Sequence, residues 1–337
     1  MKAIGLRESL REQAASWVTL QDQASVIEQG DQYVLDVQNW DVADVYAFKE
    51  QHPDVAITYL VDEVTSAMTS FAAAHDIRLL HPDELLSFIQ EKQDEKNATP
   101  ILSFWGVYPR LGTTTLALSV ANLLAAGQTR TVGVLGFNAY NAGHWLLSQR
   151  DNSLGDLISL LTMHKLNQET LMKSMQPIST GVSYLPGLRN QTQALLIQPE
   201  HVKELIHLAQ ALFDVVILDV GSVLNTALAL EGMLQAKQRY VISNDLLSAQ
   251  RQYFDHVDYV FKPLGLDLSS FLLIGNQVSN TKVTAFARTI ELTPIAGIPY
   301  LPALGLYAEQ QHDPLKFILG EKPFRKAAEN IAASINL

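Results

Sequence analysis

Short apolar strands alternate with amphipathic helices along this chain, and this alternation is the feature that most restricts its fold. Before residue 92, four apolar runs have the length of strands, and the stretches between them carry apolar side chains at helical spacing. The strands are expected at residues 3–6, 33–37, 55–61 and 77–80, with helices at 42–51 and 64–75. Because strand–helix alternation produces parallel sheets with helices on both faces, these residues are predicted to form a doubly wound α/β domain.

The same alternation returns on a larger scale after residue 100. Residues 114–126 are apolar on nearly all sides of a helix, and residues 213–219 form an apolar strand that ends in the carboxylate of Asp219. Further strands are expected at residues 100–105, 131–135, 239–243 and 271–275, with a helix that begins at Pro199. The second half is therefore predicted to be a larger α/β domain, also doubly wound, with a mostly parallel sheet.

A short polar segment separates the two α/β patterns. Residues 91–100 are charged or polar apart from Ala98 and the closing Pro100. Such a composition is typical of a linker. We predict a first domain at residues 1–91, a linker at 92–100 and a second domain at 101–337.

The composition removes several classes of function. The 337 residues include no cysteine, which excludes disulfides, cysteine-ligated zinc, iron–sulfur clusters and cysteine nucleophiles. The formal charge of −11 disfavours sequence-independent binding to DNA or to anionic lipid. The chain has no signal-type segment and no run of about 18 apolar residues, so we expect a soluble cytoplasmic protein.

The first loop of the second domain has the position of a phosphate-binding loop. Residues 106–115 lie between a predicted buried strand and a predicted buried helix, and Gly112, Thr114 and Thr115 fit the end of such a loop. The N-terminus of a helix also favours anions. Glycine before threonines is equally typical of an ordinary helix start, so both interpretations stay open at this point.

Several further segments follow in an order that resembles the MinD/ParA family of deviant P-loop ATPases. Residues 213–219 are similar to the family's Walker B strand, and residues 273–278 resemble the strand whose asparagine, here Asn276, contacts adenine. The other similar segments are residues 184–189, 198–202, 298–302 and 313–315. The resemblance implies a P-loop NTPase fold, ATP with Mg²⁺ as ligand, Thr114 and Asp219 on the metal, and a homodimer. The structural alternatives are that Asp219 caps a local turn at the end of its strand and that Asn276 is a turn residue.

The loop departs from the family pattern at the positions that carry charge. Thr113 stands where the family has the lysine for the β- and γ-phosphates, and Tyr108 replaces the signature lysine that reaches the partner's nucleotide. Pro109 and Arg110 replace two glycines, and Asn138 stands where the family has a catalytic aspartate. Each lost ammonium removes a charge-assisted contact worth about 1.5–3 kcal/mol.

These departures predict a vestigial or weak nucleotide site and no hydrolysis. Its residues would be Arg110, Gly112, Thr113, Thr114, Thr115 and Asn276, with Mg²⁺ on Asp219 and Thr114 only if a nucleotide binds. No cofactor is certain, and no catalytic residue is assigned, because the amide of Asn138 cannot act as a base. Arg110 restores some positive charge, so an ATPase with a non-standard loop is the alternative.

The first domain resembles a response-regulator receiver domain, which has a flavodoxin-like fold. Residues 31–36 are similar to the strand that ends in the phosphoacceptor, which would be Asp36 here. Residues 52–57 resemble the segment that leads into the fourth strand. The acidic pair that holds Mg²⁺ is reduced to Arg7-Glu8, and His81-Pro82 replaces Lys-Pro. We therefore expect Asp36 to be a structural residue and the domain to be degenerate.

A degenerate receiver joined to a MinD-like domain resembles the CpaE/TadZ proteins, which place the Flp (type IVb) pilus secretion machinery in bacteria. The resemblance implies a pseudo-ATPase scaffold that contacts secretion or pilus assembly proteins, at the inner face of the membrane or the cell pole. A ParA-like DNA-partitioning protein is a further alternative, but only a modest basic cluster near residues 316–326 supports it, so nucleic acid is not expected. Residues 324–335 form a helix with a small apolar face, which leaves peripheral membrane contact open.

Overall fold

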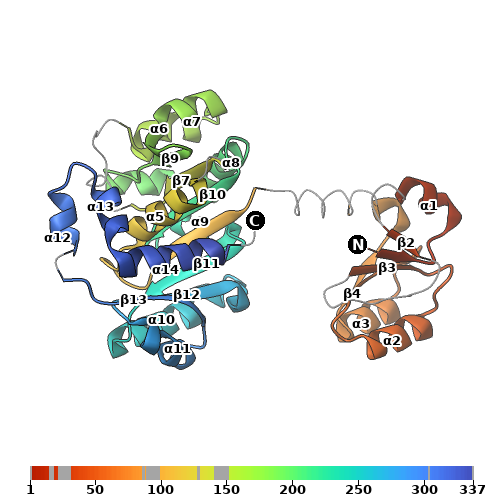
Figure 1. The fold of residues 1–337 in the computed structure, drawn as a ribbon. Helices are drawn as coiled ribbons and strands as arrows, with labels where there is room; N and C mark the ends of the chain where they lie inside the picture. The colour runs from red at the N-terminus through yellow and green to blue at the C-terminus, as the bar shows by residue number, and fades with distance from the viewer. Residues whose placement is uncertain are drawn as a thin grey trace. The chain divides into compact units, whose positions relative to one another are not determined.

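The chain forms two compact units, Met1–Ala98 and Thr99–Leu337. The computed structural model describes residues 2–14, 19–21, 32–85, 88, 99–126, 130–139, 152–302 and 304–335. Each unit is built on a sheet flanked by helices (Figure 1).

The first unit has five parallel strands in the order β2-β1-β3-β4-β5. The strands are β1 (Lys2–Ile4), β2 (Thr19–Gln21), β3 (Gln32–Asp36), β4 (Ala56–Leu60) and β5 (Ile77–Leu80). The helices are α1 (Glu8–Ala14), α2 (Val42–Gln51) and α3 (Ser66–Ala74), and Pro82–Glu84 form a short 3₁₀ helix. This strand order is that of flavodoxin-like sheets, with its switch point between β1 and β3. The predicted parallel α/β fold is confirmed, whereas β2 had no apolar run to indicate it.

Local signals in the sequence place the elements of the first unit. Asp41 caps α2: the Asp44 amide donates to its side chain at 2.8 Å, and the Asp44 carboxylate accepts from the Asp41 amide at 3.4 Å. Such a capping box satisfies amides at a helix start that have no partner within the helix. Tyr33 and Tyr59, from neighbouring strands, are buried in the core, and the Tyr59 hydroxyl donates to the Trp40 carbonyl at 2.7 Å.

The second unit has eight strands in the order β13-β12-β11-β6-β10-β7-β9-β8, and only β8 pairs in the antiparallel sense. The strands are β6 (Ile101–Gly106), β7 (Val132–Gly136), β8 (Gln176–Ser179), β9 (Val182–Leu185), β10 (Val215–Gly221), β11 (Gln238–Ser243), β12 (Phe271–Asn276) and β13 (Thr293–Ile298). The mostly parallel sheet is as predicted. The edge strand β8 and its neighbour β9 were not predicted, because each has only 4 residues and β8 is also partly exposed, so neither has a clear apolar pattern.

Helices cover both faces of this sheet, and α14 packs beside α5. The α-helices are α5 (Thr113–Ala125), α6 (Leu154–Thr162), α7 (Gln168–Ser174), α8 (Pro199–Gln210), α9 (Ala227–Gln235), α10 (Leu247–His256), α11 (Asn280–Thr289), α12 (Leu304–Glu309), α13 (Pro314–Gly320) and α14 (Lys322–Ala333). A π-helical turn, Val257–Phe261, continues α10, and 3₁₀ turns lie at Gln191–Leu196 and Leu268–Ser270. The helices predicted over residues 114–126 and from Pro199 are confirmed.

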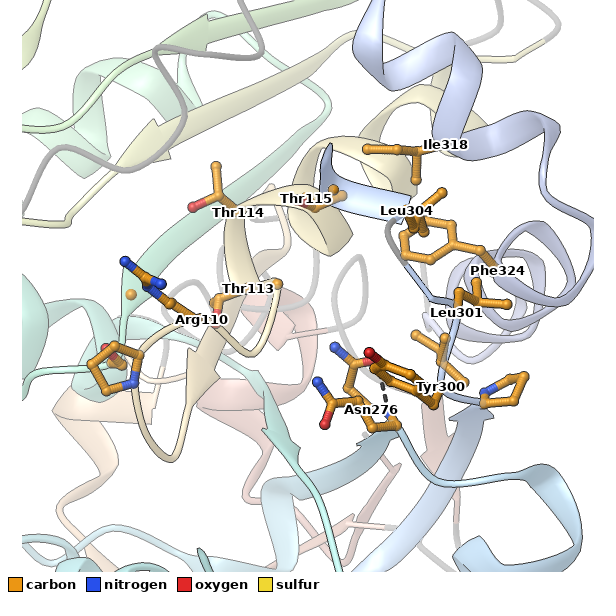
Figure 2. Close-up of a pocket in the computed structure, with 18 of the residues that line it drawn as sticks. Arg110, Thr113, Thr114, Thr115, Asn276, Tyr300, Leu301, Leu304, Ile318 and Phe324 are labelled. Atoms are coloured by element: carbon orange, nitrogen blue, oxygen red, sulfur yellow. Dashed lines mark hydrogen bonds between the residues drawn. The ribbon is translucent and has the colours of Figure 1, made fainter. Parts of the chain in front are cut away.

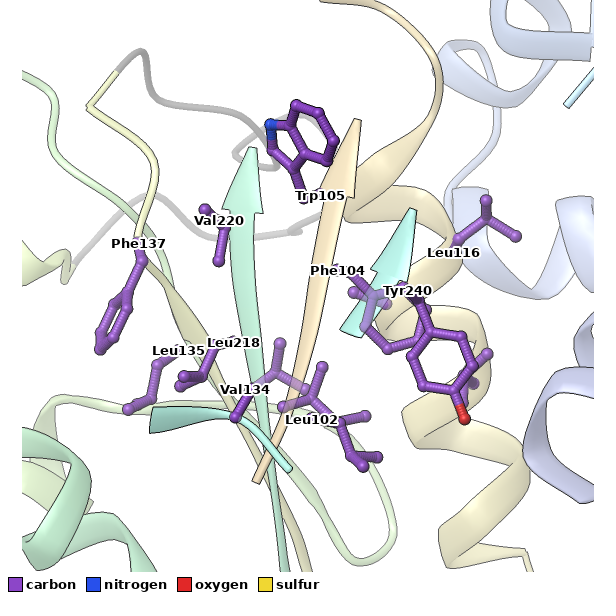
Figure 3. Close-up of a cluster of buried hydrophobic side chains, with 14 of the residues drawn as sticks. Leu102, Phe104, Trp105, Leu116, Val134, Leu135, Phe137, Leu218, Val220 and Tyr240 are labelled. Carbon is purple, nitrogen blue, oxygen red and sulfur yellow. The ribbon is translucent and has the colours of Figure 1, made fainter. Parts of the chain in front are cut away.

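The core of the second unit lies on the central strands β6, β7 and β10 (Figure 3). Every residue of β10 is buried, as expected for a parallel strand covered on both faces. The rings of Phe104 and Tyr240 stack at 4.8 Å between centroids and join β6 to β11. This packing holds the carboxyl ends of the central strands in fixed relative positions.

The apolar face of the last helix is part of this core. Phe324, Ala328, Ile331 and Ile335 are all buried, so the face that could have met lipid packs inside the unit. None of the helices in the described part of the chain is long and apolar enough to cross a membrane.

Candidate functional site

A cavity of about 730 Å³ opens at the carboxyl edge of the second sheet (Figure 2). Parallel sheets bind ligands at this edge, because loops and helix N-termini meet there. The loop between β6 and α5, the start of the segment after β7, the turns after β10 and β12, and the segment after β13 all contribute to the wall. The cavity brings together the predicted residues Arg110, Gly112, Thr113, Thr114, Thr115, Asn138 and Asn276.

Two glycines let the β6–α5 loop pack closely on the start of α5. Gly112 precedes α5 at a φ of +75°, in the left-handed region, where a side chain is strained. A Cβ on Gly106 would lie 2.5 Å from the Thr113 hydroxyl oxygen, so only glycine leaves room for that side chain. The Thr113 hydroxyl therefore lies against the base of the loop, where the family lysine would supply a charge.

Arg110 is the only charged side chain among the described residues that line the cavity. Its φ of +68° lies in the left-handed region, which costs a residue with a side chain about 1 kcal/mol. The side chain is exposed and forms no hydrogen bond or ion pair with other described residues. Arg110 thus places one guanidinium at the mouth of the cavity.

Tyr108, at the signature lysine position, is held within its own subunit. The Asn244 side-chain amide donates to its hydroxyl, so the loop is tied to the end of β11. Partial burial raises the pKa of the Tyr108 hydroxyl, and the bond from Asn244 opposes that rise. The tyrosine therefore offers no positive charge and points to a neighbour in the same chain.

Thr114 and Asp219 form a buried pair behind the cavity wall. The Thr114 hydroxyl donates to the Asp219 carboxylate at 2.6 Å, and the Gly221 amide donates to its other oxygen at 3.3 Å. Burial raises the pKa of Asp219 to about 6, against the two hydrogen bonds, which lower it. No cationic side chain neutralises this carboxylate among the interactions of the described residues.

The MinD/ParA resemblance implies Mg²⁺ with a nucleotide, and the residues fit this pair only in part. A hydroxyl bonded to a strand-end carboxylate, as in Thr114 and Asp219, would suit Mg²⁺, which prefers oxygen ligands. The phosphate side does not fit. Pro109 has no amide hydrogen to donate, Thr113 and Tyr108 are uncharged, and Arg110 is the one cation among the described residues that line the cavity. No catalytic step therefore follows from this geometry.

Asn138 packs against glycines of two neighbouring loops. The Leu188 amide donates to the Asn138 carbonyl at 3.0 Å. A Cβ on Gly221, whose φ is +71°, would lie 2.6 Å from the Asn138 amide nitrogen, and a Cβ on Gly187 would lie 2.3 Å from its carbonyl. Sequence reasoning missed these two glycines. The sequence signal that could have identified Gly221 is its position two residues after Asp219.

Asn276 ties β12 to the loop. Its amide donates to the Leu111 carbonyl at 2.8 Å, and its oxygen accepts from the Gln277 amide at 2.9 Å. The side chain therefore spans the wall of the cavity. These bonds are those expected of Asn276 as a turn residue, and its contact with adenine stays a prediction.

The far wall of the cavity is apolar, and sequence reasoning missed most of it. Figure 2 shows Leu301 and Leu304 grouped with Ile318 and Phe324. Tyr300, which is 67% exposed, also lines the cavity. The residues come from the segment after β13 and from α12, α13 and α14. No periodic pattern in the sequence links them, because only the fold brings these helices to one cavity.

Asp36 lies in the first unit, at the carboxyl end of β3, and is completely buried. The Arg7 guanidinium donates to both of its oxygens, each at 2.9 Å, and the Arg7 and Gln38 amides donate at 3.0 and 3.1 Å. Arg7 also reaches Asp62 at 2.6 Å. The hydrogen bonds to Asp36, followed by those to Asp62, raise the pKa of Arg7. The guanidinium of Arg7 therefore neutralises this buried carboxylate.

A parallel sheet whose central strand leads through a glycine-bearing loop into a buried helix is typical of nucleotide-binding α/β folds, among them the P-loop NTPases. A ParA family ATPase from Chlorobium tepidum TLS is similar, at a TM-score of 0.60 and 17% identity over 71% of this chain and 100% of that chain. The cell division ATPase MinD from Pyrococcus furiosus has a TM-score of 0.56 at 22% identity, over 70% of this chain and 100% of its own.

MinD from Pyrococcus horikoshii OT3, solved with Mg-ADP, has a TM-score of 0.55 at 20% identity over 70% of this chain and 99% of its own. A match of this length must run through the second unit, since the first is too short to supply it. The second unit therefore has the fold of the MinD/ParA P-loop ATPases. The chain matches no protein-family model and no curated protein sequence.

Proposed function

We propose that this chain is a non-hydrolysing, MinD-like scaffold that localises or helps assemble a bacterial secretion or pilus machine through protein–protein contacts. One observation carries the proposal. The positions that the family resemblance assigns to the phosphate-binding lysines hold Thr113, packed against Gly106, and Tyr108, bonded to Asn244. Both family lysines are thus replaced by uncharged side chains in a loop that is otherwise well packed.

The geometry of the site supports ATP hydrolysis even less than it supports ATP binding. Asn138 provides an amide where a carboxylate would be needed near the attacking water, and it packs on the glycines of neighbouring loops. The second unit keeps the sheet, the cavity and the loop, but it has no charge at Tyr108 and Thr113. We therefore propose that it acts through contacts with other proteins. A homodimer and secretion or pilus assembly proteins are the proposed partners, and the cytoplasm, at the inner face of the membrane or the pole, is the proposed location.

Calorimetry with ATP and Mg²⁺ tests the proposal on the full chain. We expect no saturable binding by the wild type at millimolar ATP and a gain of binding in Thr113→Lys. Thr113→Met is the matched control, because it adds a side chain of similar length without the charge. Strong binding by the wild type, comparable to that of Thr113→Lys, would overturn the proposal.

The alternative is a nucleotide-binding ATPase with a non-standard loop. The Thr114–Asp219 pair and the guanidinium of Arg110 favour it, because they supply a metal-side pair and one cation. This alternative predicts saturable ATP binding that is lost in Arg110→Gln. A ParA-like DNA-partitioning role predicts salt-dependent retention on nonspecific DNA, but in the sparse basic cluster Arg325 is already paired with Glu329 at 3.0 Å.

For the first unit we propose a degenerate receiver domain over residues 1–91, joined by a linker at 92–100 to the domain at 101–337. The order of its five strands supports this proposal, as does the position of Asp36 at the end of β3. Partners would bind the domain in its unphosphorylated form, because Arg7 already pairs with Asp36. Incubation with acetyl phosphate and Mg²⁺ should therefore leave the mass of the protein unchanged.

A further inference from the structure

The cavity at the carboxyl edge of the second sheet has two chemically different sides. Arg110 is the one charged side chain among the described residues that line it, and Figure 2 shows it on one side of the start of α5. The other side holds four apolar side chains, which we call the apolar wall: Leu301, Leu304, Ile318 and Phe324. A ligand that fills the cavity therefore meets a cation at one end and a hydrocarbon surface at the other.

The polar side of the cavity suits a ligand with one negative charge. Thr113, Thr114 and Thr115 line it together with Arg110 but carry no charge, so a polyphosphate would find a single cation. The Arg110 side chain is exposed and forms no hydrogen bond or ion pair with other described residues. Its strained φ of +68° is of the kind that is concentrated at active sites and ligand clamps. A guanidinium matches one carboxylate in a two-point contact.

The apolar wall suits an alkyl chain better than a nucleotide base. Its four side chains contain no hydrogen-bonding atom, and a base needs partners for its ring nitrogens, whereas a saturated chain needs none. Asn276, on the same cavity, already donates to the Leu111 carbonyl and accepts from the Gln277 amide. Transfer of an alkyl chain from water to this wall would supply the driving force for binding.

We propose that the cavity binds a free acyl carboxylate, with the carboxylate on Arg110 and the alkyl chain on the apolar wall. The volume of about 730 Å³ lies within the range of about 300–1,000 Å³ that is usual for small-molecule sites. The bound ligand would join the β6–α5 loop to α12, α13 and α14 and so stabilise the second unit. The proposed scaffold function does not itself require a small ligand.

Calorimetry of the full chain with octanoate tests the proposal. We expect saturable binding by the wild type, at one site per chain. Two further probes each keep half of the ligand: 1-octanol has the chain without the charge, and acetate has the charge without the chain. Each should bind about tenfold more weakly than octanoate or less tightly still. Absence of octanoate binding would overturn the proposal, as would equally tight binding of 1-octanol.

Two pairs of variants locate the ligand in the cavity. Arg110→Gln should weaken octanoate binding about tenfold or more, whereas Arg288→Gln, an exposed position on α11, should leave it unchanged. Leu304→Ser should also weaken it, whereas Leu306→Ser should not, because Leu306 lies on the same helix but does not line the cavity. Unchanged binding in Arg110→Gln and Leu304→Ser would show that octanoate binds elsewhere and would overturn the proposal.

Vesicles of phosphatidylglycerol separate a free carboxylate from a membrane lipid. The wild type should not float with them, and flotation that is lost in Leu304→Ser would assign the cavity to a lipid chain and overturn the proposal. The ATP calorimetry is a separate readout. Tight ATP binding would refute the proposed function, whereas failure of octanoate to bind would refute only the acyl carboxylate and leave the proposed function as it stands.

Discussion

Arg7 and Asp36 form a two-point ion pair at the carboxyl edge of the first sheet, with Nε and Nη2 each 2.9 Å from a carboxylate oxygen. Arg7 follows β1 and Asp36 ends β3, so the pair closes the switch point between adjacent strands. It also extends to Asp62 beyond β4. A fixed cation thus stands beside the one carboxylate that the receiver resemblance singled out.

Removing the Arg7 guanidinium should strongly destabilise the first unit. Arg7→Met leaves Asp36 buried and without its cation, and breaking a pair of this kind costs about 3–5 kcal/mol. Hydrogen exchange of the full chain measures the loss within the first unit alone. Lys262→Met is the control, because its pair with Asp258 is exposed and worth about 0.5 kcal/mol or less. Equal protection in Arg7→Met and the wild type would contradict this account.

Asp219 should make the second unit less stable as pH rises. Burial raises its pKa from 3.8 to about 6, so between these values the native state binds more protons than the unfolded state. The free energy of unfolding should therefore fall across this window, by about 3 kcal/mol at most, and stay low above pH 6. Urea unfolding at a series of pH values measures it, and Asp219→Asn should flatten the slope.

In the same unit, the pKa of Asp214 is shifted in the opposite direction to that of Asp219. Hydrogen bonds from the Thr131 amide and hydroxyl lower the pKa of Asp214, which is exposed. Its contribution to stability is present above its ordinary pKa and is lost as pH falls through the lowered value. Asp214→Asn should remove this acid sensitivity and leave the slope due to Asp219 unchanged. If both variants altered the same part of the pH profile, the assignment to Asp219 would be wrong.

Substitution of Gly221 should separate steric crowding from backbone strain. Gly221 and Gly265 have nearly the same left-handed φ, +71° and +68°, but a Cβ meets Asn138 at 2.6 Å only in the first case. Gly265→Ala should cost about 1 kcal/mol from strain alone. Gly221→Ala should cost about 2–4 kcal/mol, because the contact with Asn138 must also yield. Equal losses in thermal or urea unfolding would show that Asn138 moves freely.

Arg110→Gly should stabilise the second unit slightly. The left-handed φ of +68° strains arginine but not glycine, and the side chain makes no hydrogen bond or ion pair with another described residue. The expected gain is below about 1 kcal/mol, since glycine also adds entropy to the unfolded chain. A loss of stability on urea unfolding would indicate that the guanidinium has a partner within the folded chain.

The sequence was sufficient for elements that are covered on both faces. β10 and α5 are mostly apolar and are buried over most of their length, so their patterns could be recognised without any tertiary information. The position of the loop between β6 and α5 followed from the same patterns. The edge strands β8 and β13 and the short strands β2 and β9 escaped prediction, because short or partly exposed strands leave little periodic signal.

The candidate site depended more on the fold. The sequence by itself determined that the loop carries uncharged side chains at Tyr108 and Thr113, since the residue at a position needs no structure to be read. Only the tertiary structure decided that Arg7 neutralises Asp36, that Asn138 rests on Gly221, and that Leu304 and Phe324 close the same cavity. These residues are far apart in the chain and share no period, and burial of the sheet faces is what brings them together.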